Sequence, residues 1–101
     1  MAIAEISVVP LGTKTPSVSQ YVARAVKVLE QEKSIRYEIT AMGTIIEGDL
    51  DRILAVVKKM HESTFGDGVA RVLTIFKIDD RRDRAQDMKA KVDSLKKKLQ
   101  D

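Results

Sequence analysis

The fold of this chain is decided by one stretch, Arg36-Tyr37-Glu38-Ile39-Thr40-Ala41-Met42-Gly43-Thr44-Ile45-Ile46-Glu47-Gly48-Asp49. Before Gly43, apolar or aromatic residues alternate with polar ones, which places the two sets on opposite faces of a strand. Gly43 can adopt backbone angles closed to other residues, so we expect a turn there. The β-branched run after Gly43 favours a second strand, and Asp49 is a suitable N-cap for a helix. The stretch therefore predicts two strands joined at Gly43 and followed by a helix.

Periodicity on either side of this stretch predicts the remaining elements. Alternation over Ala2–Val9 predicts a strand, and residues 10–16, with their prolines and glycine, predict a loop. Ser17 is then the expected cap of a first helix. Residues 69–78 predict a fourth strand that carries large apolar groups on both faces. The apolar stripes expected on the two helices are Val18, Tyr21, Val22, Ala25, Val26 and Leu29, and Leu50, Ile53, Leu54, Val57, Met60 and His61.

The resulting order is β-α-β-β-α-β, which predicts an α+β, ferredoxin-like sandwich with both helices on one face of the sheet. We expect residues 1–101 to form a single domain with an extra C-terminal helix over residues 82–99. The seam of that helix is narrow, and charged residues occupy the rest of its surface. Its apolar positions are Ala85, Met88, Val92, Leu95 and Leu99.

An isolated helix of this kind is marginally stable in water, so it must lie against another surface. The fourth strand raises the same question, because one of its two apolar faces would be left open to solvent. We therefore predict a homo-oligomer, a dimer or tetramer whose sheets meet face to face, with the C-terminal helix sealing the contact. The alternative is a monomer in which this helix covers its own sheet.

Composition excludes several classes of site. The chain has no cysteine and one histidine, which excludes disulfides, thiolate metal sites and Cys–His nucleophiles. No apolar run is long enough to cross a bilayer, and Met1–Ile6 does not resemble a signal peptide, so we expect a cytoplasmic protein without a membrane partner. The formal net charge is +3, and residues 77–101 hold nine basic and six acidic residues, so the whole excess lies there. Because aromatic residues are not interleaved with basic ones, nucleic acid is not the expected partner.

Polar residues on the strands are the remaining candidates for function. By strand parity Glu5, Ser7, Glu38 and Thr40 share the face away from the helices, where a salt-bridge network or a ligand could satisfy them. Glu47 could bind a cation or accept from an amine, or be an exposed strand-end carboxylate near the second helix. His61 is expected to serve packing. No set of residues has catalytic roles at matching spacing, so we expect neither an enzyme nor a cofactor.

Several strings resemble the small thiamine-binding protein family, long a conserved family of unknown function. They are Val9-Pro10-Leu11-Gly12-Thr13, Ser17-Val18-Ser19-Gln20-Tyr21-Val22-Ala23, Tyr37-Glu38, Met42-Gly43-Thr44-Ile45-Ile46-Glu47-Gly48 and Lys77-Ile78-Asp79-Asp80-Arg81-Arg82. The resemblance covers residues 3–83 and implies a ferredoxin-like fold, dimers that pair their sheets, and often tetramers. It also implies non-catalytic binding of thiamine or its hydroxymethylpyrimidine moiety. Many members resemble Pro-Met-Gly-Thr at the turn, where this chain has Ala41.

Thiamine combines an aminopyrimidine with a cationic thiazolium ring, so its pocket needs carboxylates, hydroxyls and apolar walls. Thr44 and Glu47 are predicted ligand contacts because they lie in the motif that carries the resemblance. Four further residues have suitable chemistry and are added as candidates: Met42, Thr13, Ser7 and Glu38. Asp80-Arg81-Arg82 is interpreted first as an interface salt-bridge cluster and second as a ligand contact. The alternative function is a structural or regulatory oligomer that does not bind thiamine.

Overall fold

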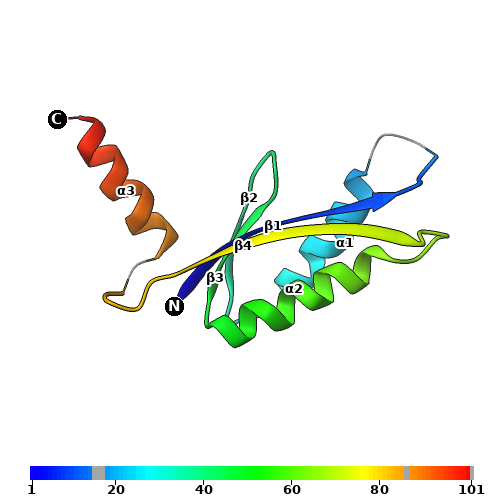
Figure 1. The fold of residues 1–101 in the computed structure, drawn as a ribbon, viewed down its shortest axis with the longest axis horizontal. Coiled ribbons are helices and arrows are strands. Elements are labelled where there is room, and N and C mark those ends of the chain that lie inside the picture. The colour runs from blue at the N-terminus through cyan, green and yellow to red at the C-terminus, as the bar shows by residue number, and fades with distance from the viewer. Residues whose placement is uncertain (15–17, 86, 101) are drawn as a thin grey trace.

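Four antiparallel strands form one sheet in the order β2-β3-β1-β4, and two helices cover one of its faces (Figure 1). The computed structural model describes residues 1–14, 18–85 and 87–100. Its elements are β1 (Ala2–Leu11), α1 (Ser19–Glu30), β2 (Arg36–Ile39), β3 (Thr44–Gly48), α2 (Leu50–Thr64), β4 (Arg71–Asp80) and α3 (Met88–Leu99). The predicted ferredoxin-like α+β fold with an extra C-terminal helix is thereby confirmed. The predicted cap Ser17 lies outside the described residues.

The N-terminal strand β1 is the centre of the sheet. It pairs with β4 along its whole length, from Ala2 opposite Asp80 to Leu11 opposite Arg71. On its other side β1 pairs with β3 only as far as Ile6 opposite Thr44. The expected loop from Pro10 therefore begins too early, because pairing with β4 keeps the chain extended to Leu11. Pro10 lies where β1 has a partner on one side only, a position in which a strand tolerates proline.

The core lies between this sheet and the two helices. Alternate residues of β1 and β3 are buried against α1 and α2, and α1 buries Tyr21, Ala25, Val26 and Leu29 as predicted. The stripe predicted for α2 is wrong in one respect. Leu54 is 43% exposed, while Val56 is 1% exposed and belongs to the core. The buried face of α2 comprises Ile53, Val56, Val57, Met60 and Thr64.

Gly43 ends the turn between β2 and β3, but for a different reason from the one predicted. Its φ is not positive, so left-handed backbone angles are not what glycine supplies. A Cβ at this position would lie 2.8 Å from the carbonyl oxygen of Ile6, which is closer than real Cβ contacts. Thr40 closes the turn, since its hydroxyl donates to the carbonyl of Gly43 over 2.7 Å. The absence of a side chain thus lets the hairpin rest on β1.

Asp49 occupies the expected N-cap position of α2, but its side chain makes no capping hydrogen bond. The third helix differs more from expectation, because α3 begins at Met88 and not at residue 82. In the intervening segment Arg81 and Arg82 pair with Asp83 and Asp80, each two residues away, which favours a turn over a helix. No residue of α3 is buried, and the helix projects from the body of the molecule (Figure 1).

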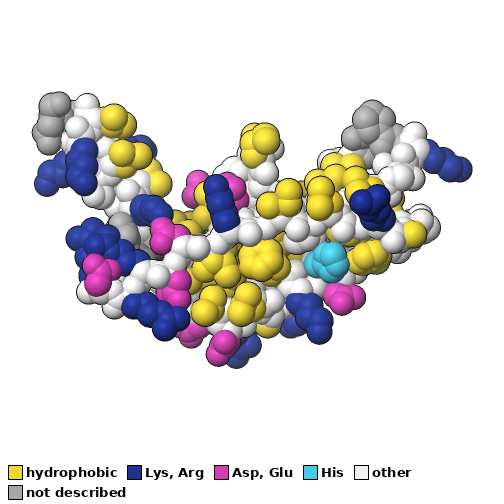
Figure 2. Space-filling model, in the orientation of Figure 1, with side chains coloured by type: hydrophobic (Ala, Val, Ile, Leu, Met, Phe, Trp, Pro, Cys, Tyr) yellow, Lys and Arg dark blue, Asp and Glu magenta, His cyan; other side chains and the backbone are white. Residues whose placement is uncertain are grey.

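The sheet face opposite the helices, termed the open face below, carries exposed apolar groups. Register places Val9 opposite Leu73 and Ser7 opposite Ile75, so these residues share that face. Leu73 is 50% exposed and Ile75 is 61% exposed. Figure 2 shows hydrophobic side chains gathered over the strands and on the side of α3 turned toward them. The prediction that β4 offers apolar groups on both faces is confirmed.

Candidate functional site

A cavity of about 430 Å³ lies where the start of α3 meets the open face, and we term it the α3 cavity. Strands β1, β3 and β4 supply its floor, and the first turns of α3 supply its wall. It combines apolar walls with two carboxylates and two amines. Its lining residues are Ile3, Ala4, Glu5, Ile45, Lys77, Ile78, Asp79, Met88, Lys91 and Val92.

The charged groups of the α3 cavity are paired with one another. The Nζ atom of Lys77 lies 3.5 Å from Oε1 of Glu5, and Lys91 pairs with Asp79. The side chain of Glu5 is 41% exposed and that of Lys77 is 81% exposed. Ion pairs this exposed contribute about 0–1 kcal/mol to stability, so a ligand can replace either partner at little cost. Both carboxylates are therefore available to a cationic ligand.

Glu47 lies beside this cavity and is buried, contrary to the expectation of an exposed strand-end carboxylate. Its side chain is 2% exposed, and its Oε2 accepts a hydrogen bond of 2.8 Å from the backbone N–H of Met88. Met88 is the first residue of α3, so this contact satisfies an N–H that has no partner within the helix. A negative charge at a helix N-terminus is also favourable. Arg36 approaches Oε1 only to 3.8 Å. Glu47 thus joins α3 to β3 and does not cap the second helix.

Three other predicted residues lie in a different place. Met42, Thr44 and Ser7 line a cavity of about 170 Å³, the hairpin cavity, beneath the turn between β2 and β3. It opens beside β1 where the pairing with β3 has ended, and α1 and Met60 complete its walls. Thr44 is buried and faces the helices, because it pairs with Ile6. Ligand pockets usually hold about 300–1,000 Å³, so this cavity is small for a whole thiamine molecule.

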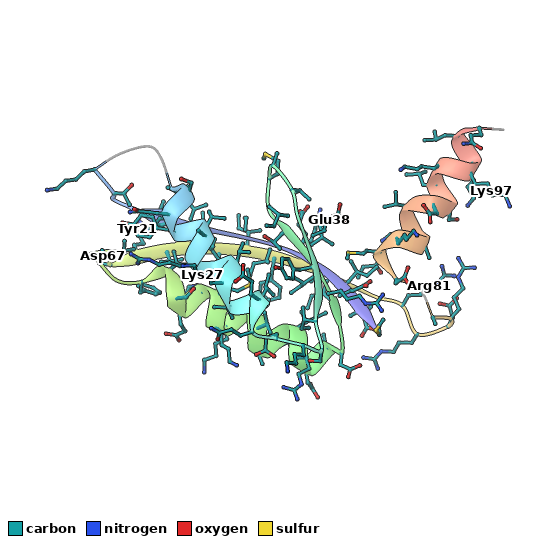
Figure 3. All side chains as sticks on the ribbon, turned by 180° about the vertical axis from the view of Figure 1, so that it is seen from behind. Tyr21, Lys27, Glu38, Asp67, Arg81 and Lys97 are labelled. Atoms are coloured by element: carbon teal, nitrogen blue, oxygen red, sulfur yellow. The ribbon has the colours of Figure 1, made fainter. Side chains whose placement is uncertain are left out.

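The last two predicted residues are separated from one another. Thr13 lines a third cavity, of about 420 Å³, at the end of the molecule where Tyr21 and Asp67 lie (Figure 3). Glu38 is exposed and pairs with Ile45, so it lies on the open face next to the α3 cavity. The structure therefore does not bring the six predicted residues together. It places three in the hairpin cavity, two beside the α3 cavity and one at the far end.

Sequence reasoning missed most of the residues that line the α3 cavity. Strand parity placed Glu5 on the open face, but neither Lys77 nor Asp79 was connected with it. Their alternation in the fourth strand is the signal that could have done so, once β1 and β4 are paired. The contribution of Lys91 has no such signal, because it depends on how α3 is placed.

The segment between β4 and α3 contains two ion pairs with bidentate or forked geometry. The Nε and Nη2 atoms of Arg81 donate to Asp83 over 2.5 Å and 2.9 Å, and Nη2 of Arg82 donates to Asp80 over 2.8 Å. The hydrogen bond from Arg82 and its positive charge lower the pKa of Asp80 below the usual range of an aspartate, and Arg81 does the same for Asp83. Both pairs therefore stay ionised from neutral pH down to below the usual aspartate range.

His61 packs between α2 and β4. Its Nδ1 lies 2.7 Å from Oγ1 of Thr74, and its ring meets that of Phe65 edge-on at 5.3 Å. In the part of the chain that the structure describes, no three His, Asp or Glu side chains are grouped to hold a metal ion. Across those same residues no helix is both long and apolar enough to span a membrane.

Comparison with known proteins relates the whole chain to one family. The family model for the thiamine-binding protein matches residues 4–96. The UPF0045 protein YqgV of Bacillus subtilis is 47% identical over 103 aligned positions, which cover 99% of each chain. A UPF0045 protein of Methanothermobacter thermautotrophicus is also 47% identical, over 98% of this chain and 100% of its own.

Solved structures agree with these relatives. The MJ1052 protein of Methanocaldococcus jannaschii superposes with a TM-score of 0.86 at 39% identity, over 94% of this chain and 95% of its own. The TM0486 protein of Thermotoga maritima, named for a proposed role in thiamine biosynthesis or salvage, shares the fold with a TM-score of 0.75 at 20% identity, over 93% of this chain and 97% of its own. Sequence and fold together show that the chain belongs to the thiamine-binding protein family.

Proposed function

We propose that this protein binds thiamine or its hydroxymethylpyrimidine moiety without catalysis, in the α3 cavity, as a cytoplasmic homo-oligomer. One observation carries the proposal: two carboxyl side chains, those of Glu5 and Asp79, line an otherwise largely apolar cavity whose volume of about 430 Å³ suits a small heteroaromatic molecule. Neither nucleic acid nor a membrane is part of the proposal.

The chemistry of the cavity matches the two halves of thiamine. The thiazolium ring carries a fixed positive charge, which a carboxylate can balance when the ring leaves water. Ile3, Ile45 and Val92 offer apolar contact to either ring. The pyrimidine amine is a donor that the second carboxylate can accept. Binding would exchange the exposed contacts of Lys77 and Lys91 for contacts with the ligand.

The predicted motif residues take different parts in this proposal. Glu47 is a positioning residue, because it holds the first turn of α3 against β3 and so maintains the cavity wall. Glu38 lies on the open face next to the cavity, where it adds negative charge. Thr44, Met42 and Ser7 belong to a narrower version of the proposal, in which the pyrimidine moiety alone enters the hairpin cavity.

Isothermal titration calorimetry with thiamine and with hydroxymethylpyrimidine tests this proposal. Glu5→Gln is expected to weaken thiamine binding about five-fold, since one charge-assisted contact worth about 1 kcal/mol is lost. Glu62→Gln is the matched control, because Glu62 is exposed on α2 and away from both cavities. Equal affinities of wild type and Glu5→Gln would remove the α3 cavity from the proposal. If neither thiamine nor hydroxymethylpyrimidine binds at millimolar concentration, the proposed function is wrong.

A second candidate is a structural or regulatory oligomer that does not bind thiamine. The exposed apolar residues Leu73 and Ile75 on the open face, and Leu95 and Leu99 on α3, favour it. It predicts a stable dimer or tetramer whose melting temperature is the same with and without thiamine.

A further inference from the structure

A second, more polar cavity adjoins the α3 cavity. This basic cavity has a volume of about 640 Å³ and lies between the segment that follows β4 and one side of α3. Asp79 and Lys91 line both cavities, so their ion pair lies at the boundary between the two. The basic cavity is lined by Asp79, Asp80, Arg81, Arg84, Lys91, Ser94, Leu95 and Lys98.

The lining of the basic cavity has uncommitted positive charge. Four cationic side chains against two carboxylates leave an excess of +2. Asp79 and Asp80 are already neutralised by Lys91 and Arg82. Arg84 and Lys98, by contrast, form no hydrogen bond or ion pair with any residue in 1–14, 18–85 and 87–100, although the charge of Arg84 acts on Asp83, which Arg81 already pairs. The cavity therefore holds two cations that no carboxylate in these parts of the chain holds in an ion pair.

The charged and polar side chains of the basic cavity come from two parts of the chain that face each other. Lys91, Ser94 and Lys98 are spaced by three and four residues, so they lie on one side of α3. That side meets the segment that carries Arg81 and Arg84. Lys97 points away from the sheet (Figure 3). Amines, a hydroxyl and guanidinium groups thus surround one cavity from two elements of the chain.

We propose that the ligand of this protein carries a phosphate-ester group, which occupies the basic cavity while the heteroaromatic part lies in the α3 cavity. This inference rests on the proposed function and narrows its ligand class to phosphorylated thiamine or phosphorylated pyrimidine. A guanidinium presents a planar set of donors that matches phosphate oxygens, and an ammonium adds a compact charge. Arg84 and Lys98 supply one of each, and Ser94 supplies a hydroxyl donor.

Titration calorimetry with thiamine, thiamine monophosphate and inorganic phosphate tests the inference. Thiamine monophosphate is expected to bind about ten-fold more tightly than thiamine, through charge-assisted contacts to exposed groups. This preference should shrink as the salt concentration rises, because exposed charges are screened. In the double variant Arg84→Gln/Lys98→Gln the ratio of the two dissociation constants is expected to fall toward one.

A matched control removes the same charges elsewhere. Arg52 and Lys58 are exposed on α2 and make no ion pair with other described residues, so Arg52→Gln/Lys58→Gln should keep the ten-fold ratio. Binding of thiamine with equal or greater affinity than its monophosphate would overturn the inference and leave the proposed function standing. Inorganic phosphate that binds without competing with thiamine monophosphate would also overturn it, since the two groups would then occupy separate sites. Failure of thiamine, its monophosphate and hydroxymethylpyrimidine alike would overturn the proposed function itself.

Discussion

At Gly43 the turn of the hairpin approaches the backbone of β1 so closely that a methyl group has no room. The atom it would meet, 2.8 Å away, is the carbonyl oxygen of Ile6 in the central strand, which cannot rotate aside. Gly43→Ala is therefore expected to lower the free energy of unfolding by about 1–3 kcal/mol, as overpacking does elsewhere. Urea denaturation followed by circular dichroism measures the loss.

Gly48→Ala is the comparison for this prediction. The nearest atom to its added methyl group, at 2.7 Å, is Cδ1 of Ile35, the flexible end of a side chain. Because that end can move, we expect a smaller loss of stability than for Gly43→Ala. A loss at Gly48 equal to or greater than that at Gly43 would contradict the interpretation that backbone contact decides the cost.

The positions of individual site residues could be predicted from the sequence only in part. Strand parity correctly placed Glu5, Ser7 and Glu38 on the open face, because a period of two depends on the backbone alone. The burial of Glu47 could not be predicted, since it is caused by α3, more than forty residues further along the chain as the contact with Met88 shows. Thr44 belongs to the motif that carries the family resemblance, but its side chain faces the helices and not the open face. A motif gives residue identity, whereas the direction of a side chain depends on register.

Among the elements, α2 shows how an apolar stripe can be assigned with the wrong rotation. Val56 lies in the core and Leu54 is 43% exposed, although both fit a helical spacing. Val56→Ala is expected to destabilise the protein by about 2 kcal/mol, from lost transfer energy and the cavity left behind. Leu54→Ala, which removes a larger side chain, should cost about 1 kcal/mol or less because that side chain is already partly in water. Thermal and urea unfolding measure the loss of stability in the two variants. A greater loss in Leu54→Ala than in Val56→Ala would contradict the assignment of Val56 to the buried face of α2.

Element types followed from periodicity, while element ends depended on contacts between distant segments. Strand β1 extends to Leu11 because β4 pairs with it there. Helix α3 starts only at Met88, where Asp87 accepts from the N–H of Ala90 over 2.7 Å and Glu47 accepts from Met88. Neither the pairing partner nor the second acceptor is visible in the local sequence. This is why the strands and helices were predicted well and their boundaries less well.

For the whole molecule, the arrangement leaves two apolar surfaces of one chain without cover. One is the open face with Leu73 and Ile75, and the other is the seam of α3 with Leu95 and Leu99. If a second copy covers the open face, Ile75→Glu should place a charge in that contact and dissociate the oligomer. Size-exclusion chromatography with light scattering is expected to show the mass of the wild-type oligomer falling toward 11.3 kDa in the variant.

Leu54→Glu provides the control, because Leu54 is a similarly exposed apolar residue on the helical side of the molecule. Its mass in solution should equal that of the wild type. A monomeric wild-type protein, or an Ile75→Glu variant of unchanged mass, would contradict a contact between open faces.

The central place of β1 has a consequence for how the chain acquires its fold. The sheet is organised around β1, which lies near the start of the sequence. Its partner along its whole length is β4, with Ala2 opposite Asp80. Contacts between such distant residues require closure of a long loop, which slows folding relative to helical proteins of similar size. During synthesis β1 emerges before β4 and must stay unpaired on this side until Arg71–Asp80 has been made. Helix α3 follows β4 in the sequence, so the four strands can pair before α3 docks over Glu47.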